Sequence, residues 1–286
     1  MTMKPTDNHV HSRWSWDTAA SSSMRLACAR AVEIGLPGLA FTEHVDFTQW
    51  SQQDSAELAL HSGKAVVPPA RIGARPRVAP LDVEGYLADL ARCREEFPDL
   101  RILSGIETGE PHLFPASVAA VLAAGDFERV LGSLHGIVYD DTLTGISNAL
   151  FARMDAHEVM RRYFADLVVL VSGSSVFTVL AHCDYPRRYW PTARAGVYAE
   201  ADFEEEYRSV FGALASSGRA LEINTRSPLA SVNLLRWWWQ EGGDEVSFGS
   251  DAHRPLRVGE HFDRAVEVVE AAGFRPGRDR FDFWRR

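Results

Sequence analysis

The sequence is poor in cysteine and in long apolar runs. Its three cysteines, Cys28, Cys93 and Cys183, show no CxxC spacing, and an odd number does not suggest a disulfide framework, so a reducing cytoplasm fits best. No stretch approaches the roughly 18 to 20 uninterrupted apolar residues of a membrane span. The polar start MTMKPTDNH lacks the apolar region of a signal peptide. We therefore expect neither a membrane protein nor an exported one.

Lysine is also scarce, and acidic residues outnumber basic ones, 39 to 30. The formal net charge is −9, no basic tract occurs, and the lysines are Lys4 and Lys64. Nucleic-acid-binding proteins display clustered basic residues, so binding to nucleic acid is not expected. The composition favours a small substrate, although a local basic pocket can still bind phosphate inside an acidic protein.

What the sequence does contain is a regular alternation of two patterns. Short apolar runs that end in polar residues are separated by longer stretches in which apolar residues recur with helical periodicity. The expected strands are 7–11, 39–42, 102–107, 130–134, 178–181, 220–224 and 246–249, and the expected helices are 24–34, 83–97, 156–171, 203–216, 232–240 and 261–272. This alternation predicts parallel strands with helices outside, as an open sheet or a closed barrel.

Two stretches interrupt the alternation. Residues 48–80 and residues 139–155 have little periodicity and read as loop insertions, which we expect to lie over the functional site. No segment has the composition of a linker. The chain is therefore expected to form one domain over residues 1–286.

Polar residues of metal-binding type follow nearly every expected strand. His9 and His11 lie at alternate positions of the first strand, so their side chains point the same way. The full set at the strand ends is His9, His11, Glu43, His44, Glu107, His135, His182, Asp184, Asn224, Asp251 and His253. The carboxyl ends of parallel strands converge on one rim. Because burying so many imidazoles and carboxylates together is costly without cations, a site for several metal ions is expected there.

The types of side chain at the rim narrow the choice of metal. Imidazole with carboxylate, and no thiolate, suits Zn, Mn or Fe. Cys183 is adjacent to His182 and should face the opposite side of the strand. The other histidines, His61, His112, His157 and His261, lie away from the strand ends and are expected to be solvated or structural.

In this order, the motifs HVH, TEH, GIE, SLH, AHCD and GSDAH resemble those of the polymerase and histidinol phosphatase (PHP) family of metal-dependent phosphoesterases. The resemblance runs from His9 to His253. It implies a distorted, TIM-like (β/α)7 barrel with a cluster of three divalent metal ions at the rim.

The resemblance also implies a distribution of ligands among the three ions. The first ion takes His9, His11, Glu107 and Asp251; Glu107 bridges to a second, completed by His135 and His182; the third takes Asp17, His44 and His253. Asp17 lies six residues beyond His11, where family members carry a histidine or an aspartate.

Three segments, AHCDYPRRYW, LEINTRS and GSDAHRPLRVG, look most like the stand-alone histidinol-phosphate phosphatases of histidine biosynthesis. This resemblance implies hydrolysis of L-histidinol phosphate. Our hypothesis is that a hydroxide bridging the two metals that share Glu107 attacks phosphorus. Arginine suits phosphate because its planar fork makes paired charge-assisted bonds, and the candidates at the rim are Arg187, Arg188, Arg226 and Arg254. Asp184 could orient a ligand histidine or act as general acid.

Several alternatives remain open from the sequence. A PHP phosphoesterase could act on nucleotides or sugar phosphates instead. An amidohydrolase is less favoured, because many of those barrels bridge their metals with a carboxylated lysine and neither lysine follows a strand. A non-catalytic metal-binding regulatory module is a further alternative, although no ligand position is lost.

The tryptophans suggest two further features. Trp14, Trp16, Trp50 and Trp190 fall in rim loops, where they could wall a pocket for a planar substrate such as imidazole. Trp237, Trp238 and Trp239 are consecutive and must face different directions on a helix. We expect one or two of them to pack against the barrel. The third could contact a second copy of the chain, so a homo-oligomer is possible.

Overall fold

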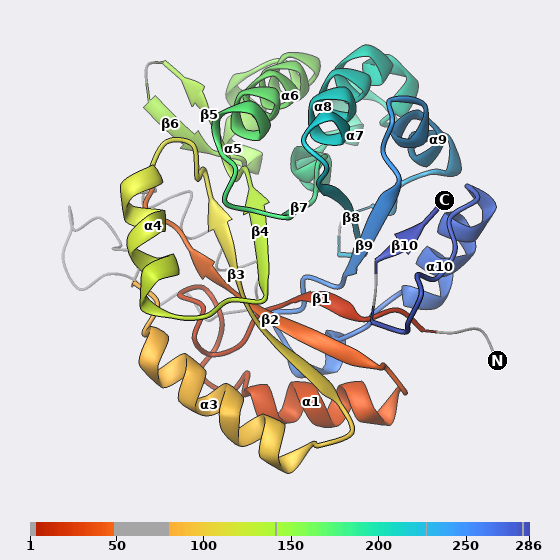
Figure 1. Ribbon diagram of the computed structural model, residues 1–286. Coiled ribbons are helices and arrows are strands. Elements are labelled where there is room, and N and C mark those ends of the chain that lie inside the picture. Colours follow the sequence, from red (N-terminus) through yellow and green to blue (C-terminus); the bar gives the residue numbers. More distant parts are fainter. Residues whose placement is uncertain (1–3, 49–79, 141, 227, 282) are drawn as a thin grey trace.

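The computed structural model describes residues 4–48, 80–140, 142–226, 228–281 and 283–286. Within them, seven strands run parallel in chain order and form one curled sheet (Figure 1). These strands are β1 (Asp7–Val10), β2 (Gly38–Val45), β3 (Arg101–Gly109), β4 (Arg129–Ser133), β7 (Val179–Leu180), β8 (Ala220–Asn224) and β9 (Glu245–Gly249). Each coincides with an expected strand.

An eighth strand, β10 (Trp284–Arg285), was not expected. It pairs antiparallel with β9, where Trp284 lies opposite Val246. A segment of two residues has no periodicity that a sequence could reveal. Only its partner strand defines it.

The curled sheet comes together where its first and seventh strands end. His11 N donates to Ala252 O at 2.9 Å, and Asp251 N donates to His9 O at 2.8 Å. These bonds join β1 to the segment after β9 at the carboxyl ends of the strands. At the other end, β10 lies along β9. The expected distorted α/β barrel is therefore confirmed, and its closure is incomplete.

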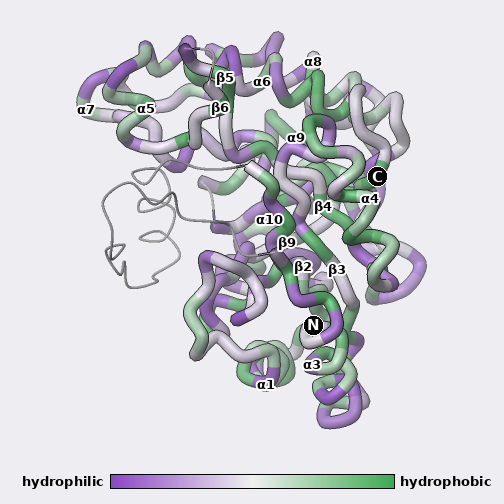
Figure 2. The backbone as a smooth tube through the Cα atoms, turned by 90° about the vertical axis from the view of Figure 1, so that its left-hand side faces the viewer, coloured by the Kyte–Doolittle hydropathy of each residue, from purple (hydrophilic) through white to green (hydrophobic). Residues whose placement is uncertain are grey.

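Helices surround the sheet, and all six expected helices are present. They are α1 (Met24–Glu33), α3 (Val83–Glu96), α6 (Ala156–Gly173), α8 (Glu204–Ser216), α9 (Val232–Gln240) and α10 (Phe262–Ala271). Side chains cap several of them; Asp155, for example, accepts from His157 N and Glu158 N at the start of α6. The apolar faces lie inward, so that Tyr163 and Leu167 of α6 are fully buried. Figure 2 shows apolar colour along the central strands and mixed colours along α1 and α3.

Helix α4 (Pro115–Ala124) was not expected from the periodicity of the sequence, for a physical reason. Its sequence PASVAAVLAA is apolar on all sides, so no single face stands out, and Val118 is its one buried residue. The helix begins at a proline, whose fixed φ suits the first helical position. Helix α7 (Thr192–Ala195) is a single short turn.

The described residues in and around the insertion at 139–155 include a hairpin and a short helix. A hairpin of β5 (Gly136–Tyr139) and β6 (Thr142–Gly145) is followed by the short helix α5 (Asn148–Arg153). Ile146 N donates to His135 O at 2.9 Å, which ties the end of the hairpin to the end of β4. The other expected insertion, at 48–80, falls on residues outside the described part of the chain except at its two ends.

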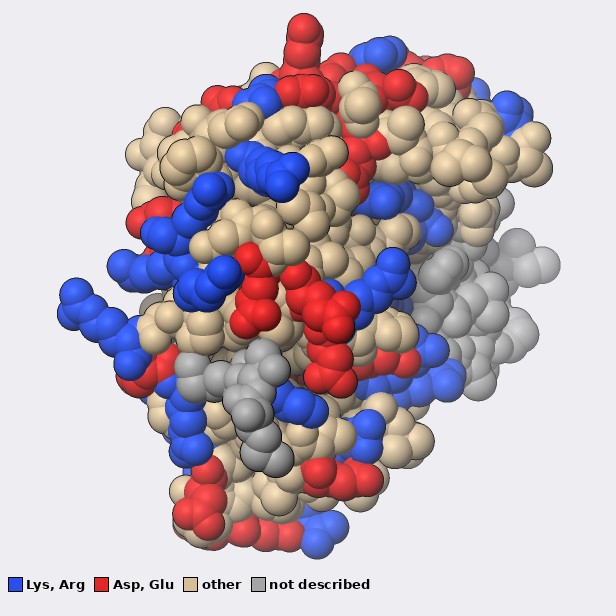
Figure 3. Space-filling model, turned by 90° about the vertical axis from the view of Figure 1, so that its right-hand side faces the viewer, with Lys and Arg blue, Asp and Glu red and all other residues tan. Residues whose placement is uncertain are grey.

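The surface carries both charges. On the face shown in Figure 3, basic and acidic side chains are interspersed. Among the helices that the structure describes, none combines the length and the apolarity that crossing a membrane requires.

Candidate metal centre

The carboxyl ends of the parallel strands meet at one rim, and all nine candidate metal ligands named from the sequence lie there, each at most 8% exposed. His, Asp and Glu side chains form four compact groups at this rim. The groups are His9, His11 and Asp251; Glu107, His135 and His182; His11, His44 and His253; and His44, Asp46 and His135. Within each group the ligand atoms lie within 4.8 Å of one another. Such groups of imidazole and carboxylate are consistent with a metal site.

Glu107 lies at the centre of the cluster. Its Oε1 is 2.8 Å from His182 Nε2 and 3.3 Å from His135 Nε2. Its Oε2 is 3.0 Å from His44 Nδ1 and 3.3 Å from His9 Nε2. The two oxygens therefore face different imidazoles, which is the arrangement that a bridging carboxylate needs. Burial alone would raise the pKa of Glu107, but the neighbouring imidazoles outweigh burial and hold it well below its usual value.

A second carboxylate, Asp17, joins the imidazoles on the outer side of the cluster. Its Oδ2 is 2.9 Å from His253 Nε2 and 3.6 Å from His44 Nε2. Burial would raise the pKa of Asp17 as well, yet His253 and His44 hold it well below its usual value. Both carboxylates therefore stay charged, as cation ligands must.

The orientation of two histidines supports the fit to a cation. His9 Nδ1 is 2.6 Å from Glu222 Oε1, and His11 Nδ1 is 3.0 Å from Ser15 Oγ, which itself donates to Glu43 Oε2 at 2.6 Å. Each Nδ1 has an oxygen that can accept its proton, which leaves each Nε2 free to present a lone pair to a bound cation. These two Nε2 atoms lie 3.0 Å apart. Two imidazole nitrogens this close in a buried site fit a shared cation.

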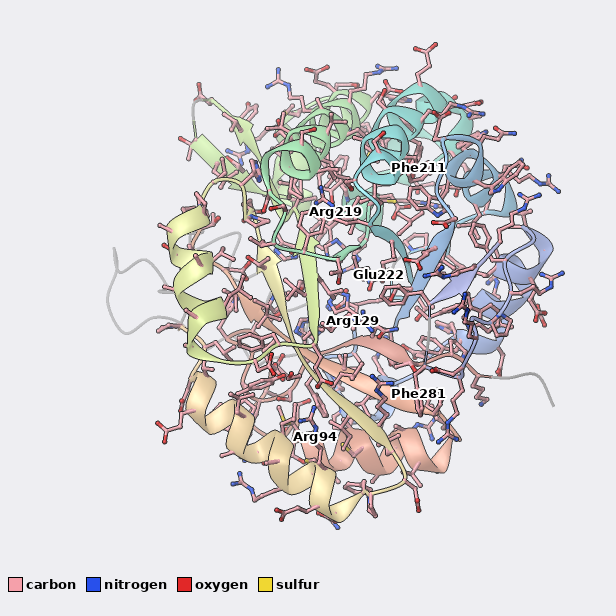
Figure 4. The ribbon with its side chains drawn as sticks, in the orientation of Figure 1. Arg94, Arg129, Phe211, Arg219, Glu222 and Phe281 are labelled. Atoms are coloured by element: carbon pink, nitrogen blue, oxygen red, sulfur yellow. The ribbon has the colours of Figure 1, made fainter. Side chains whose placement is uncertain are left out.

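Glu222 and Asp46 are parts of this site that the sequence analysis missed. Glu222 points from β8 toward the middle of the curled sheet (Figure 4) and accepts from His182 N at 2.7 Å as well as contacting His9. Asp46 Oδ1 lies 3.6 Å from His135 Nδ1. Each is two positions from a residue that was noted, Asn224 or His44, and alternation along a strand would have placed them on the same face.

Close packing around Glu222 explains the glycine of the GSDAH motif. A Cβ at Gly249 would overlap Glu222 Oε1 and would lie 2.6 Å from His9 Cβ. Only a residue without a side chain leaves room for this carboxylate against β9.

The backbone is also unusual at two of the proposed ligands. His182 has φ of 23° and Asp251 has φ of 52°, values that L residues rarely adopt. Such conformations are disfavoured and persist only where the surrounding structure imposes them, which is frequent at functional sites.

The structure separates the arginine candidates into two pairs. Arg188 and Arg226 line the cavity beside the cluster, and both reach Asp251, at 2.6 Å and 3.0 Å. Arg187 lies outside the cavity lining and pairs with Asp184, at 3.2 Å, and with Glu200, at 2.9 Å. Arg254 is exposed and lies outside that lining too.

Asp184 does not contact a ligand imidazole among the described residues. Its carboxylate accepts from Arg187 and, at 3.4 Å, from the Tyr207 hydroxyl. Burial raises the pKa of Asp184 above its usual value, although Arg187 opposes this. Asp184 is therefore not placed to orient a candidate ligand histidine. Glu222 is placed to do so, through His9.

Aromatic side chains form part of the cavity wall. Trp16, Tyr185 and Tyr189 line it together with the imidazoles. Trp14 and Trp190 lie elsewhere: their indole N–H groups donate to Asp89 and to Gly196 O, at 3.0 and 2.9 Å. Trp50 is outside the described residues.

The three consecutive tryptophans of α9 do face different directions. Trp238 is fully buried, whereas Trp239 is 46% exposed and stacks against the Arg286 guanidinium at 3.9 Å. Two of the remaining histidines are also placed: His112 is partly buried, and His157 lies beside Trp190 and Phe203.

A curled α/β barrel with buried imidazoles and carboxylates at its carboxyl rim matches a known class, and the chain belongs to it: the model of the PHP domain family matches residues 7–226. Within that class, the chain is 27% identical over 284 residues to the histidinol-phosphatase of Lactococcus lactis subsp. lactis, covering 95% of this chain and 93% of the relative. It is 26% identical over 280 residues to a protein of Deinococcus radiodurans named "Probable histidinol-phosphatase", covering 94% of each.

A solved structure agrees with the fold. Histidinol phosphate phosphatase from Lactococcus lactis subsp. lactis, in complex with zinc, L-histidinol and phosphate, superposes with a TM-score of 0.77 over 96% of this chain and 95% of that one, at 23% identity. This chain is thus a PHP-family hydrolase related to the histidinol-phosphatases.

Proposed function

We propose that the protein is a metal-dependent phosphomonoesterase that hydrolyses L-histidinol phosphate to histidinol and phosphate. The observation that carries the proposal is one cavity in which the buried ligand cluster meets two arginines, Arg188 and Arg226. The full-length similarity to a histidinol-phosphatase supports the choice of substrate.

Three divalent cations, Zn, Mn or Fe, would be held by the residues already described. One ion would be held by His9, His11, Glu107 and Asp251, one by Glu107, His135 and His182, and one by Asp17, His44 and His253. Divalent cations bound there would supply a water of pKa about 7 and would polarise the phosphoryl oxygens. Asp46 could complete the ligand set near His44 and His135.

The protein's own contribution is to bind and orient the phosphate. Arg188 and Arg226 converge on Asp251 from two elements, the turn after β7 and the end of β8, and a phosphate in the cavity would meet two fixed cationic groups. Glu222 and the Ser15–Glu43 pair keep His9 and His11 in one tautomer. Trp16, Tyr185 and Tyr189 offer flat apolar surface beside the cluster, which suits an imidazole ring.

Replacing Arg226 with alanine should chiefly raise the Michaelis constant. A charge-assisted bond to phosphate contributes about 1.5–3 kcal/mol, so KM should rise by roughly tenfold or more. Steady-state kinetics of Arg226→Ala would measure this, with Arg25→Ala as control, because Arg25 is exposed and pairs with Glu96 on the outer helices. An unchanged KM would indicate that Arg188, Arg187 or Arg254 contacts the phosphate instead.

A phosphatase screen tests the substrate. The metal-loaded protein, with its metal content measured, is offered L-histidinol phosphate, nucleoside monophosphates, sugar phosphates and p-nitrophenyl phosphate, and a chelated sample is the blank. We expect the highest kcat/KM for L-histidinol phosphate. A stronger signal with a nucleotide or sugar phosphate would reassign the substrate, and a metal-loaded protein inert toward the whole panel would favour a non-catalytic module.

A further inference from the structure

A second cavity opens at the opposite end of the barrel, where the strands begin. Its volume is about 470 Å³, and four arginines line it, Arg101, Arg129, Arg278 and Arg285, with one carboxylate, Glu245. Arg101 starts β3 and shares a strand face with Glu107, six positions later. At about 3.3 Å per residue, the backbone of Arg101 lies roughly 20 Å from that of Glu107.

Two of the arginines have no ion-pair partner among the described residues. In the part of the chain that the structure describes, neither Arg101 nor Arg129 makes an ion pair, whereas Glu245 pairs with Arg285. Arg129 Nε donates to Asn8 Oδ1 at 3.1 Å, and its terminal nitrogens make no hydrogen bond to a described residue. Burial, with a smaller contribution from Arg101, lowers the pKa of Arg129 to about 10, although Glu128 and Glu245 oppose this, so Arg129 is still charged at neutral pH.

Aromatic rings hold both guanidinium groups in place. The Arg101 Cζ lies 4.9 Å from the Phe281 ring centroid, and the Arg129 Cζ lies 4.3 Å from that of Phe283. Both rings come from the C-terminal segment; Figure 4 labels Arg129 and Phe281 at this end of the barrel. Phe283 also packs on a small apolar cluster inside the barrel that includes Leu131 and Val179. The aromatic rings therefore fix the positions of the two guanidinium groups in the absence of a ligand.

From these observations we infer that the cavity at the amino ends of the strands binds a small anion bearing a phosphate group, at a site separate from the metal centre. Two guanidinium groups without an ion-pair partner among the described residues match a phosphate dianion in charge, and each can make paired hydrogen bonds to phosphoryl oxygens. A bound anion would relieve the repulsion between Arg101 and Arg129. It would also hold the C-terminal segment against the barrel, because Phe281 and Phe283 stack on the same two arginines.

Calorimetric titration of inorganic phosphate into the metal-loaded, full-length protein tests this site. Arg101→Ala is the test variant, because Arg101 is exposed and its loss should leave the fold intact. We expect one phosphate-binding event to weaken by roughly tenfold or more in this variant. Turnover of p-nitrophenyl phosphate should be unchanged, and Arg92→Ala, another exposed arginine, should titrate like the wild type.

The location of the anion is tested separately by diffraction. Wild-type crystals soaked in tungstate, a phosphate analogue with strong anomalous scattering, should show a peak between Arg101 and Arg129 that is absent from Arg101→Ala crystals. Identical titrations of the two proteins, together with no tungstate at this position, would overturn the inference. Phenylphosphonate distinguishes the source of the phosphate: tighter binding than inorganic phosphate would indicate an aromatic phosphate ester, and equal binding would indicate the phosphate group alone.

Discussion

Replacing Glu107 with glutamine is expected to abolish turnover while leaving the fold intact. The two carboxylate oxygens of Glu107 lie within 3.4 Å of nitrogens from His9, His11, His44, His135 and His182. Glutamine keeps the shape but removes the charge and one of the two acceptor oxygens. Changes in outer-shell partners of a metal already cost about 10- to 100-fold, so losing a bridging ligand should cost more than about 100-fold in kcat.

Activity and metal content should fall together in this variant. Elemental analysis, kinetics with the best substrate of the screen and far-UV circular dichroism would be measured on the same preparation. Glu96→Gln is the matched control, because Glu96 lies at the exposed end of α3 and pairs with Arg25. Wild-type turnover in Glu107→Gln, with the full complement of metal, would exclude the proposed role of this carboxylate.

The barrel and the position of its site could be anticipated because both depend on local patterns. Each parallel strand is a short apolar run, and parallel strands must direct their carboxyl ends to one rim. His9 and His11 could be recognised as a pair from their spacing, since alternation along a strand is independent of the rest of the fold. Glu107 and Asp251, more than a hundred residues apart, meet because β3 and β9 end at the same rim.

The features that escaped the sequence analysis depend on tertiary contacts. Strand β10 is defined only by its pairing with β9, in which Trp284 lies opposite Val246. The same holds for the arginine cavity: Arg101 and Arg129 look like ordinary surface residues until the sheet forms, with Arg129 opposite Gly105 of β3, and both side chains line one cavity. The roles of Arg188 and Arg187 are likewise set by the turn after β7, which directs adjacent side chains to Asp251 and to Asp184.

Glu222 illustrates how a residue outside the recognised motifs can control the site. Its Oε1 lies 2.6 Å from His9 Nδ1, and its Oε2 accepts from His182 N at 2.7 Å and from Asn224 Nδ2 at 3.1 Å. One carboxylate thus fixes the ring of one proposed ligand and the backbone of another. It contributes no ligand atom in this arrangement, so its effect must pass through His9 and His182.

Glu222→Gln should therefore weaken metal binding by about 10- to 100-fold, the usual cost of losing such a partner. If the amide nitrogen faces His9, two donors meet and the imidazole must change tautomer, which removes the Nε2 lone pair from the metal. Competition with a chelator would measure the affinity, and excess metal should restore most of the activity, which it should not do for Glu107→Gln. Glu245→Gln, on the neighbouring strand at the far end of the barrel, is the control.

Gly249→Ala tests the same arrangement without changing a charge. The added Cβ would overlap Glu222 Oε1 and would crowd His9 Cβ, so the contact between these two side chains must change, and the loss of metal affinity should resemble that of Glu222→Gln. Agreement between a charge change and a steric change would assign the effect to the contact between Glu222 and His9. Unchanged metal affinity in both variants would mean that His9 keeps its orientation without Glu222, and the carboxylate would then serve only to hold the backbone at His182.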